Sequence, residues 1–151
     1  MKKLVSDSSK CTGCRICEDT CSTAFYKRKD RLYSAIRIKQ CEDGGFSVAV
    51  CDQCGDCLQM CQIMALSTAK NGVVRLDKKV CIGCLVCVGE CLRDYIFYND
   101  ELPTPIKCSA CGLCAKDCPS GALKIVENDS SKIAIGPEEI LEIFGEEFSH
   151  A

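Results

Sequence analysis

The sequence has no Trp and a single His, His150, and Phe, Trp and Tyr together make up only 6% of its 151 residues. A lone imidazole next to the last residue excludes a histidine-based acid–base site, and it excludes Rieske-type ligation, which takes two His. No apolar run approaches the ~18 residues of a membrane-spanning helix. The first seven residues, MKKLVSD, turn polar after a basic pair, so we expect no secretory signal and no membrane span.

Motifs of substrate-transforming sites are also missing. The sequence contains neither a Gly-x-Gly-x-x-Gly fingerprint nor a phosphate-binding loop, so nothing indicates a nucleotide or flavin site. It also lacks the Cys-x3-Cys-x2-Cys spacing of radical S-adenosylmethionine enzymes, in which one iron stays open to substrate. We therefore expect no catalytic residues in this chain.

Cysteine, by contrast, is abundant: sixteen of the 17 Cys fall into four copies of the pattern Cys-x2-Cys-x2-Cys-x3-Cys. Run 1 is Cys11, Cys14, Cys17 and Cys21; run 2 is Cys51, Cys54, Cys57 and Cys61; run 3 is Cys81, Cys84, Cys87 and Cys91; run 4 is Cys108, Cys111, Cys114 and Cys118. Only Cys41 lies outside the runs, and we expect it to be a small, partly buried hydrophobic residue. A redox or inter-subunit role for Cys41 stays open.

This spacing is that of bacterial ferredoxins, in which three cysteines of a run hold one [4Fe–4S] cluster and the fourth reaches a different cluster. Disulfides would need an oxidising compartment, which nothing in the sequence indicates. Structural zinc usually takes two Cys-x2-Cys pairs separated by a longer loop, and a metallothionein-like chain would lack β-prone segments. The four unbroken runs therefore predict four [4Fe–4S] clusters, with all sixteen cysteines as iron ligands.

The residues inside the runs fit this chemistry. Small residues let backbone N–H groups approach the sulfides of a cluster, and such N–H···S contacts help to set the reduction potential. These residues are Gly13, Gly55, Gly83, Ala110 and Gly112. The three-residue spacing puts the fourth cysteine about one helical turn beyond the third, so it points away from the first cluster.

Turn signals separate short β-prone segments between the runs. The two hairpin signals are Asn71-Gly72, between Leu66–Ala69 and Val73–Leu76, and Gly44-Gly45, between Ala35–Lys39 and Phe46–Val50. The segments that follow the four runs are Leu32–Ile38, Met64–Thr68, Tyr95–Tyr98 and Ala122–Val126. We predict an α+β fold of duplicated two-cluster ferredoxin-like lobes, with short antiparallel hairpins and short helices at the Cys-x3-Cys segments.

The body of the chain, residues 1–126, contains the four runs, and the segment after it differs from it in charge. Residues 127–151 form an acidic tail, in which Gly136-Pro137-Glu138 predicts a helix over 137–148. Its apolar face either packs on this chain or docks a partner subunit. The basic run Lys27-Arg28-Lys29, with Arg31, is either a solvated loop or a dock for an acidic redox partner. Nucleic acid is not expected as a partner, because clusters make the protein strongly anionic.

The four runs resemble the four-cluster iron–sulfur electron-transfer subunits of redox complexes. The resemblance covers residues 8–126 and rests on Cys11-Thr12-Gly13-Cys14-Arg15-Ile16-Cys17-Glu18 and on Cys118-Pro119-Ser120-Gly121-Ala122-Leu123. Such subunits serve molybdenum and tungsten oxidoreductases, formate hydrogenlyase-type complexes and carbon monoxide dehydrogenases. In size and regularity the chain looks most like the small subunit of tungsten aldehyde oxidoreductases. Only run 4 keeps the family's Pro after the fourth cysteine.

The resemblance implies how the runs combine. Runs 1 and 4 share one lobe, from about 1–40 and 104–126, and runs 2 and 3 share the other, from about 46–100. The implied ligand sets are set A, Cys11, Cys14, Cys17 and Cys118; set B, Cys108, Cys111, Cys114 and Cys21; set C, Cys51, Cys54, Cys57 and Cys91; and set D, Cys81, Cys84, Cys87 and Cys61.

These observations predict an electron-transfer iron–sulfur subunit of anaerobic metabolism rather than an enzyme. We expect a cytoplasmic hetero-oligomer in which the chain relays electrons between a catalytic oxidoreductase subunit, of the tungsten or molybdenum type, and a ferredoxin, flavin or other redox subunit. The alternative is a free-standing soluble polyferredoxin that shuttles electrons between enzymes.

Overall fold

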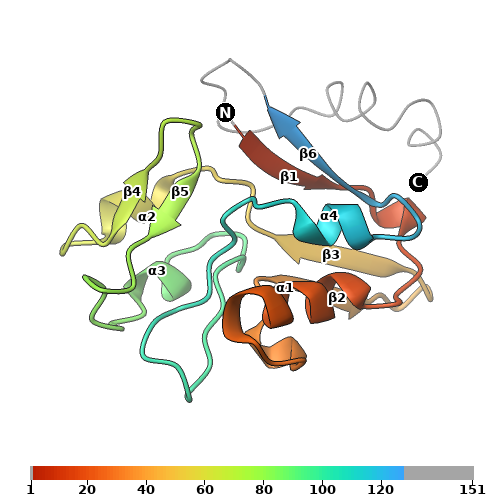
Figure 1. Cartoon of the computed structure of the whole chain (residues 1–151), viewed down its shortest axis with the longest axis horizontal. Helices are drawn as coiled ribbons and strands as arrows, with labels where there is room; N and C mark the ends of the chain where they lie inside the picture. The colour runs from red at the N-terminus through yellow and green to blue at the C-terminus, as the bar shows by residue number, and fades with distance from the viewer. Residues whose placement is uncertain (1, 128–151) are drawn as a thin grey trace.

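The computed structural model describes residues 2–127 (Figure 1). The helix predicted over 137–148, most of the acidic tail and His150 lie outside the described residues. Within residues 2–127, no helix combines the length and the apolar character that crossing a membrane requires.

Three two-stranded antiparallel sheets make up the β structure. They pair β1 (Lys2–Ser6) with β6 (Leu123–Glu127), β2 (Ile36–Gln40) with β3 (Phe46–Val50), and β4 (Leu66–Thr68) with β5 (Val74–Leu76). The register of the first sheet sets Leu4 opposite Ile125. The prediction of a small α+β fold with short antiparallel hairpins is therefore confirmed.

Both predicted hairpin turns form where the sequence placed them. Gly72 adopts a φ of 80°, and the Asn71 side chain accepts a hydrogen bond from the backbone N–H of Val73 at 3.3 Å. Gly44 adopts a φ of 84° in the β2–β3 turn. Both positions need the left-handed backbone conformation that glycine reaches at no steric cost.

Two of the predicted β-prone segments differ from the prediction. Tyr95–Tyr98 forms only an isolated bridge, between Phe97 and Ile106, because two prolines near its partner segment remove backbone donors. At the start of Leu32–Ile38, Leu32 lies in the 3-10 helix η2 (Arg31–Tyr33) and is 60% exposed. The strand β2 begins only at Ile36.

Strand β1 was not predicted from the sequence. Its partner β6 lies about 120 residues away, so no local turn signal marks the pair. The pairing brings the N-terminal segment onto run 4 and buries Leu4 and Lys3.

Four α-helices begin within the four runs, as predicted. They are α1 (Ile16–Tyr26), α2 (Asp56–Met60), α3 (Val86–Gly89) and α4 (Leu113–Asp117). Each follows a residue in the left-handed conformation: Arg15, Gly55, Leu85 and Gly112. A further 3-10 helix, η1 (Ser8–Lys10), is capped by the buried Asp7 side chain. Only α1 continues past the fourth cysteine of its run.

The buried side chains form two hydrophobic clusters. The first joins β1, β2, β3, β6, α1 and α4, and its members are Leu4, Cys17, Ile36, Ile38, Val48, Val50, Cys114 and Leu123. The second joins α2, β4 and β5 to the segment around residue 96, and its members are Cys57, Leu66, Val74 and Ile96. Cysteines of the runs belong to both clusters, so the apolar core and the predicted sites occupy the same space.

Candidate functional site

The four runs follow the same backbone path around their first cysteine. In each run the second residue after that cysteine has a positive φ; these residues are Gly13 (72°), Gln53 (64°), Gly83 (72°) and Ala110 (51°). In three runs its backbone N–H donates to the sulfur of the first cysteine: Gln53 to Cys51 at 3.4 Å, Gly83 to Cys81 at 3.4 Å and Ala110 to Cys108 at 3.3 Å. Backbone N–H groups thus reach cysteine sulfurs in these runs. Their approach to the sulfides of a cluster stays a prediction.

The fourth cysteine of each run also receives backbone donors. The N–H groups of Ala65 and Tyr95, each four residues downstream, donate to Cys61 at 3.3 Å and to Cys91 at 3.4 Å. Run 1 differs because α1 continues through Cys21, so no turn follows it directly. Its sulfur instead accepts from the N–H of Ala35, at 3.4 Å.

Cysteines from runs 1 and 4 lie together. Cys17 and Cys114 are members of the first hydrophobic cluster, and Cys11, Cys21, Cys108 and Cys118 pack against it. A hydrogen bond of 2.9 Å from the Thr20 hydroxyl to the Asp117 carboxylate joins α1 to α4. The structure thus brings these two runs together although about 90 residues separate them.

Cysteines from runs 2 and 3 lie together around the second hydrophobic cluster. Cys57 is a member of that cluster, and Cys61, Cys87 and Cys91 pack against it.

Two hollows are each lined by four cysteines of mixed origin. One contains Cys108, Cys111 and Cys114 of run 4 with Cys21 of run 1. The other contains Cys51, Cys54 and Cys57 of run 2 with Cys91 of run 3. In both, the first three cysteines of one run face the fourth cysteine of another run.

The remaining fourth cysteines also neighbour a different run. Burial raises the pKa of Cys17 to about 12, with further contributions from the charges of Glu18, Cys11 and Cys118. Burial likewise raises the pKa of Cys87, and the charges of Cys81, Cys84 and Cys61 act in the same direction. Cys118 therefore lies near the first cysteines of run 1, and Cys61 near those of run 3.

Burial also raises the pKa values of thiols in runs 2 and 4. Burial raises the pKa of Cys57 to about 11, although the charge of Lys107 acts in the opposite direction. Cys118 is the exception: burial raises its pKa, but hydrogen bonds from Ser120 and from the backbone N–H of Ala122 outweigh this and lower it overall. Thiolates are the ligand form of cysteine, so metal binding at the buried thiols must release protons.

Glu18, in the motif that carries the family resemblance, holds run 1 in place. Its carboxylate is buried, accepts a hydrogen bond from the backbone N–H of Ile38 at 2.8 Å, and lies 3.7 Å from Arg15 and 3.6 Å from Arg31. Arg28 pairs with Glu101 at 3.0 Å. Two of the four residues of the predicted basic patch, Arg28 and Arg31, thus have carboxylate partners within the chain.

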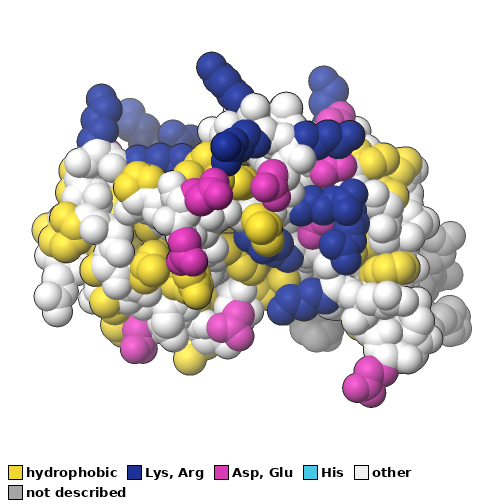
Figure 2. Space-filling view, turned by 90° about the horizontal axis from the view of Figure 1, so that it is seen from below, with side chains coloured by type: hydrophobic (Ala, Val, Ile, Leu, Met, Phe, Trp, Pro, Cys, Tyr) yellow, Lys and Arg dark blue, Asp and Glu magenta, His cyan; other side chains and the backbone are white. Residues whose placement is uncertain are grey.

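Figure 2 shows a face on which Lys and Arg side chains gather beside Asp and Glu, with hydrophobic side chains exposed among them.

The prediction that Cys41 is partly buried was wrong, because the residue is exposed. It lies in the β2–β3 turn, where its backbone N–H donates to the Gly45 carbonyl at 2.8 Å. Cys41 is not among the residues of either hydrophobic cluster.

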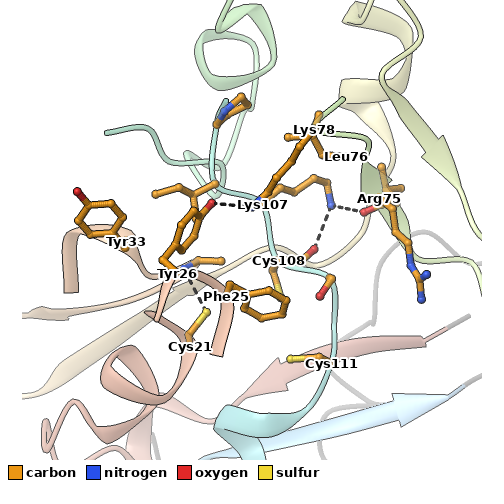
Figure 3. Close-up of a pocket in the computed structure, with 15 residues that line it drawn as sticks. Cys21, Phe25, Tyr26, Tyr33, Arg75, Leu76, Lys78, Lys107, Cys108 and Cys111 are labelled. Atoms are coloured by element: carbon orange, nitrogen blue, oxygen red, sulfur yellow. Dashed lines mark hydrogen bonds between the residues drawn. The ribbon is translucent and has the colours of Figure 1, made fainter. Parts of the chain in front are cut away.

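Two polar residues were not predicted from the sequence, Gln53 of run 2 and Lys107, which precedes run 4. They lie where these two runs meet. Lys107 lines a cavity of about 300 Å³ together with Cys21, Cys108 and Cys111, among others (Figure 3). The Lys107 ammonium lies 3.4 Å from the Cys51 sulfur and donates to the side-chain oxygen of Gln53 at 3.0 Å. One signal for Gln53 was available: its position holds Gly or Ala in the other three runs.

The donor set fits iron–sulfur clusters better than a single metal ion. Among residues 2–127, no group of three or more His, Cys, Asp or Glu side chains is arranged for one ion. A single zinc ion needs its ligands within about 2.3 Å of one point, whereas a cluster presents its irons at separate corners. Thiols that receive backbone N–H groups and line hollows in fours have the chemistry that clusters require.

Comparison with known proteins identifies relatives of the same kind. A probable anaerobic dimethyl sulfoxide reductase chain, YnfG, of Escherichia coli strain K12 is 30% identical over 142 residues, which cover 78% of this chain and 69% of the relative. The thiosulfate reductase electron transfer subunit PhsB of Salmonella typhi is 26% identical over 158 residues, which cover 91% of this chain and 82% of the relative.

A third relative is much longer than this chain. It is the beta chain of the NADH-dependent phenylglyoxylate dehydrogenase of Aromatoleum evansii, which is 33% identical over 130 residues. The match covers 80% of this chain but spans only 29% of the relative. No family model matches the chain.

Among solved structures, a chain of the active site complex BamBC of benzoyl coenzyme A reductase has a TM-score of 0.52 at 20% identity, covering 99% of this chain and 95% of that one. At this identity the likeness concerns the fold alone. Together with the sequence relatives, the four runs and their geometry show that the chain belongs to the ferredoxin-like iron–sulfur electron-transfer proteins that occur as subunits of anaerobic reductase complexes.

Proposed function

We propose that this chain is a four-cluster electron-relay subunit and not an enzyme. Sets A, B, C and D would each hold one [4Fe–4S] cluster, so that sixteen cysteines fill every iron corner. When bound, such clusters take up and release single electrons. With no iron left open, the chain offers substrate no coordination position.

The observation that carries the proposal is the composition of the two four-cysteine hollows. If each run held a cluster with its own four cysteines, Cys21 would lie beside Cys14 and not beside Cys111. Instead, Cys21 lines a hollow with run 4, and Cys91 lines one with run 2. This exchange of the fourth cysteine is what the two-cluster ferredoxin arrangement requires.

The neighbours of the buried thiols support a serial order of the four sets. Cys17, from set A, and Cys114, from set B, are members of the same hydrophobic cluster. Cys51, from set C, and Cys108, also from set B, are joined through Lys107, whose ammonium lies 3.4 Å from the Cys51 sulfur and 3.4 Å from the Cys108 carbonyl.

Cys57 of set C is a member of the second hydrophobic cluster, and Cys87 of set D packs against that cluster. The resulting order is A, B, C, D, and we propose that electrons enter at one end and leave at the other. In the same proposal the chain divides into two lobes, with A and B in one and C and D in the other.

The partner would be the catalytic subunit of an oxidoreductase of the molybdenum or tungsten type, at one end of the series, with a second redox protein at the other. The names of the relatives support a reductase complex in general, and the tungsten aldehyde oxidoreductase type rests on the sequence resemblance alone. A cytoplasmic location stays a prediction of the sequence.

Anaerobic purification from the native host tests this function. We expect the chain to elute with a larger redox subunit in size-exclusion chromatography, and dithionite to bleach its visible absorbance reversibly. A lone peak at the monomer mass would favour the free shuttle over the docked subunit. Substrate turnover by the isolated chain would contradict both.

A further inference from the structure

Lys107 carries a positive charge into the contact between sets B and C. Its side chain is half-buried, and its ammonium donates to the Val74 carbonyl at 2.9 Å (Figure 3). The ammonium also donates to the Gln53 side-chain oxygen at 3.0 Å. The Cys51 sulfur and the Cys108 carbonyl each lie 3.4 Å away. Every one of these partners is an acceptor, as an ammonium with three donors and no lone pair requires.

Gln53 holds this ammonium in place. It is 1% exposed and adopts a φ of 64°, a conformation that costs a non-glycine residue energy. Its side-chain oxygen accepts from the Val74 N–H at 3.0 Å as well as from Lys107, and its amide nitrogen donates to the Cys108 carbonyl at 2.9 Å. One buried side chain therefore ties run 2, β5 and run 4 together at the ammonium.

The compensating negative charge must come from the cysteines. No ion pair within residues 2–127 joins Lys107 to a carboxylate. A half-buried ammonium without a counter-charge is costly, and its nearest group that can carry a negative charge is the Cys51 sulfur. The charged network is complete when Cys51 is a thiolate in a metal site.

We infer that Lys107, positioned by Gln53, is the built-in counter-charge of set C and raises the reduction potential of the cluster that Cys51 helps to hold. Reduction adds one electron and one negative charge to that site, and a cation 3.4 Å from a ligand sulfur stabilises the reduced form more than the oxidised form. This inference rests on the proposed function, because it presupposes a cluster at set C.

A charge-matched series of variants tests the inference in the full-length, anaerobically reconstituted protein. Lys107→Met removes the charge at similar side-chain length, and Lys107→Arg keeps the charge. Lys78→Met is the matched control: Lys78 lines the same cavity, but its ammonium contacts Tyr26 and no cysteine. Gln53→Glu keeps the size and shape of the side chain that contacts Lys107 and adds a negative charge beside set C. Iron per chain is measured first, and each cluster signal is then titrated potentiometrically by electron paramagnetic resonance.

We expect one signal to shift to lower potential in Lys107→Met and the same signal to shift in the same direction in Gln53→Glu. Lys107→Arg and Lys78→Met should leave all signals near their wild-type potentials. Wild-type potentials for every signal in Lys107→Met at wild-type iron content would overturn the inference. Where Lys107→Met loses iron, unchanged potentials in Gln53→Glu overturn it instead. A wild-type protein without a cluster at set C would contradict the proposed function, whatever the variants do.

Discussion

The carboxylate of Glu18 accepts a hydrogen bond from the backbone N–H of Ile38, with 2.8 Å between Oε1 and the nitrogen. This contact joins the helix that carries Cys17 and Cys21 to strand β2. Arg15 and Arg31 lie at ion-pair distance from the other carboxylate oxygen, which has no hydrogen-bond partner. A buried side chain directly after a candidate ligand thus fixes the position of that ligand relative to the sheet.

Replacing Glu18 by Ala should destabilise the protein by about 1–3 kcal/mol, because the buried N–H of Ile38 loses its acceptor. Glu18→Gln should cost less, since an amide oxygen can still accept from Ile38. Anaerobic urea titration followed by circular dichroism measures both changes, with Glu42→Ala in the exposed β2–β3 turn as the control. Equal midpoints for Glu18→Ala and Glu42→Ala would show that the contact does not stabilise the fold.

Two glycines with similar backbone conformations should respond differently to Ala. Gly83 (φ 72°) and Gly121 (φ 69°) both pay for a left-handed Ala, but only at Gly83 would the new Cβ lie 2.3 Å from a backbone oxygen, that of Pro103. We expect Gly83→Ala to cost about 1–3 kcal/mol more than Gly121→Ala, and to release iron sooner under chelator. The rate of absorbance loss at matched chelator concentration gives the comparison, and similar rates would argue against the close approach of Pro103.

Single Cys→Ser variants test which cysteines share a cluster. Cys21→Ser and Cys111→Ser should alter the same signal in electron paramagnetic resonance, although the two residues belong to different runs. Cys118→Ser and Cys14→Ser should together alter another signal. The opposite result, in which Cys21→Ser and Cys14→Ser alter one common signal, would mean that each run holds a cluster by itself.

The exposed Cys41 should be dispensable. Cys41→Ser is expected to retain the full iron content and all cluster signals, because Cys41 is exposed in the β2–β3 turn and belongs to neither hydrophobic cluster. Metal analysis and the absorbance spectrum of the variant check this directly. A loss of about four irons per chain would make Cys41 a ligand and displace one of the sixteen.

The features that the sequence predicted are local in the chain. The four runs, the Asn71-Gly72 turn and the helix starts depend on residues within about ten positions of one another, where spacing and turn chemistry determine the structure. Strand β1 could not be predicted in this way, because its stability comes from a partner near the other end of the described chain. Tyr95–Tyr98 has the composition of a strand but lacks a partner with enough backbone donors.

The polar network around Lys107 was also beyond local patterns. Lys107 acquires its role from Cys51 and Val74, which lie 56 and 33 residues away in the sequence. The sequence does contain one hint, in that Gln53 occupies a loop position held by Gly13, Gly83 and Ala110 in the other runs. A large side chain at a position whose positive φ favours glycine indicates that the side chain makes a specific contact.

The iron and acid-labile sulfide content of the anaerobically reconstituted chain tests the central claim most directly. If every one of the four sets holds a [4Fe–4S] cluster, each chain should contain about 16 irons and as many sulfides. About eight irons per chain after complete reconstitution, or zinc in place of iron, would contradict the account.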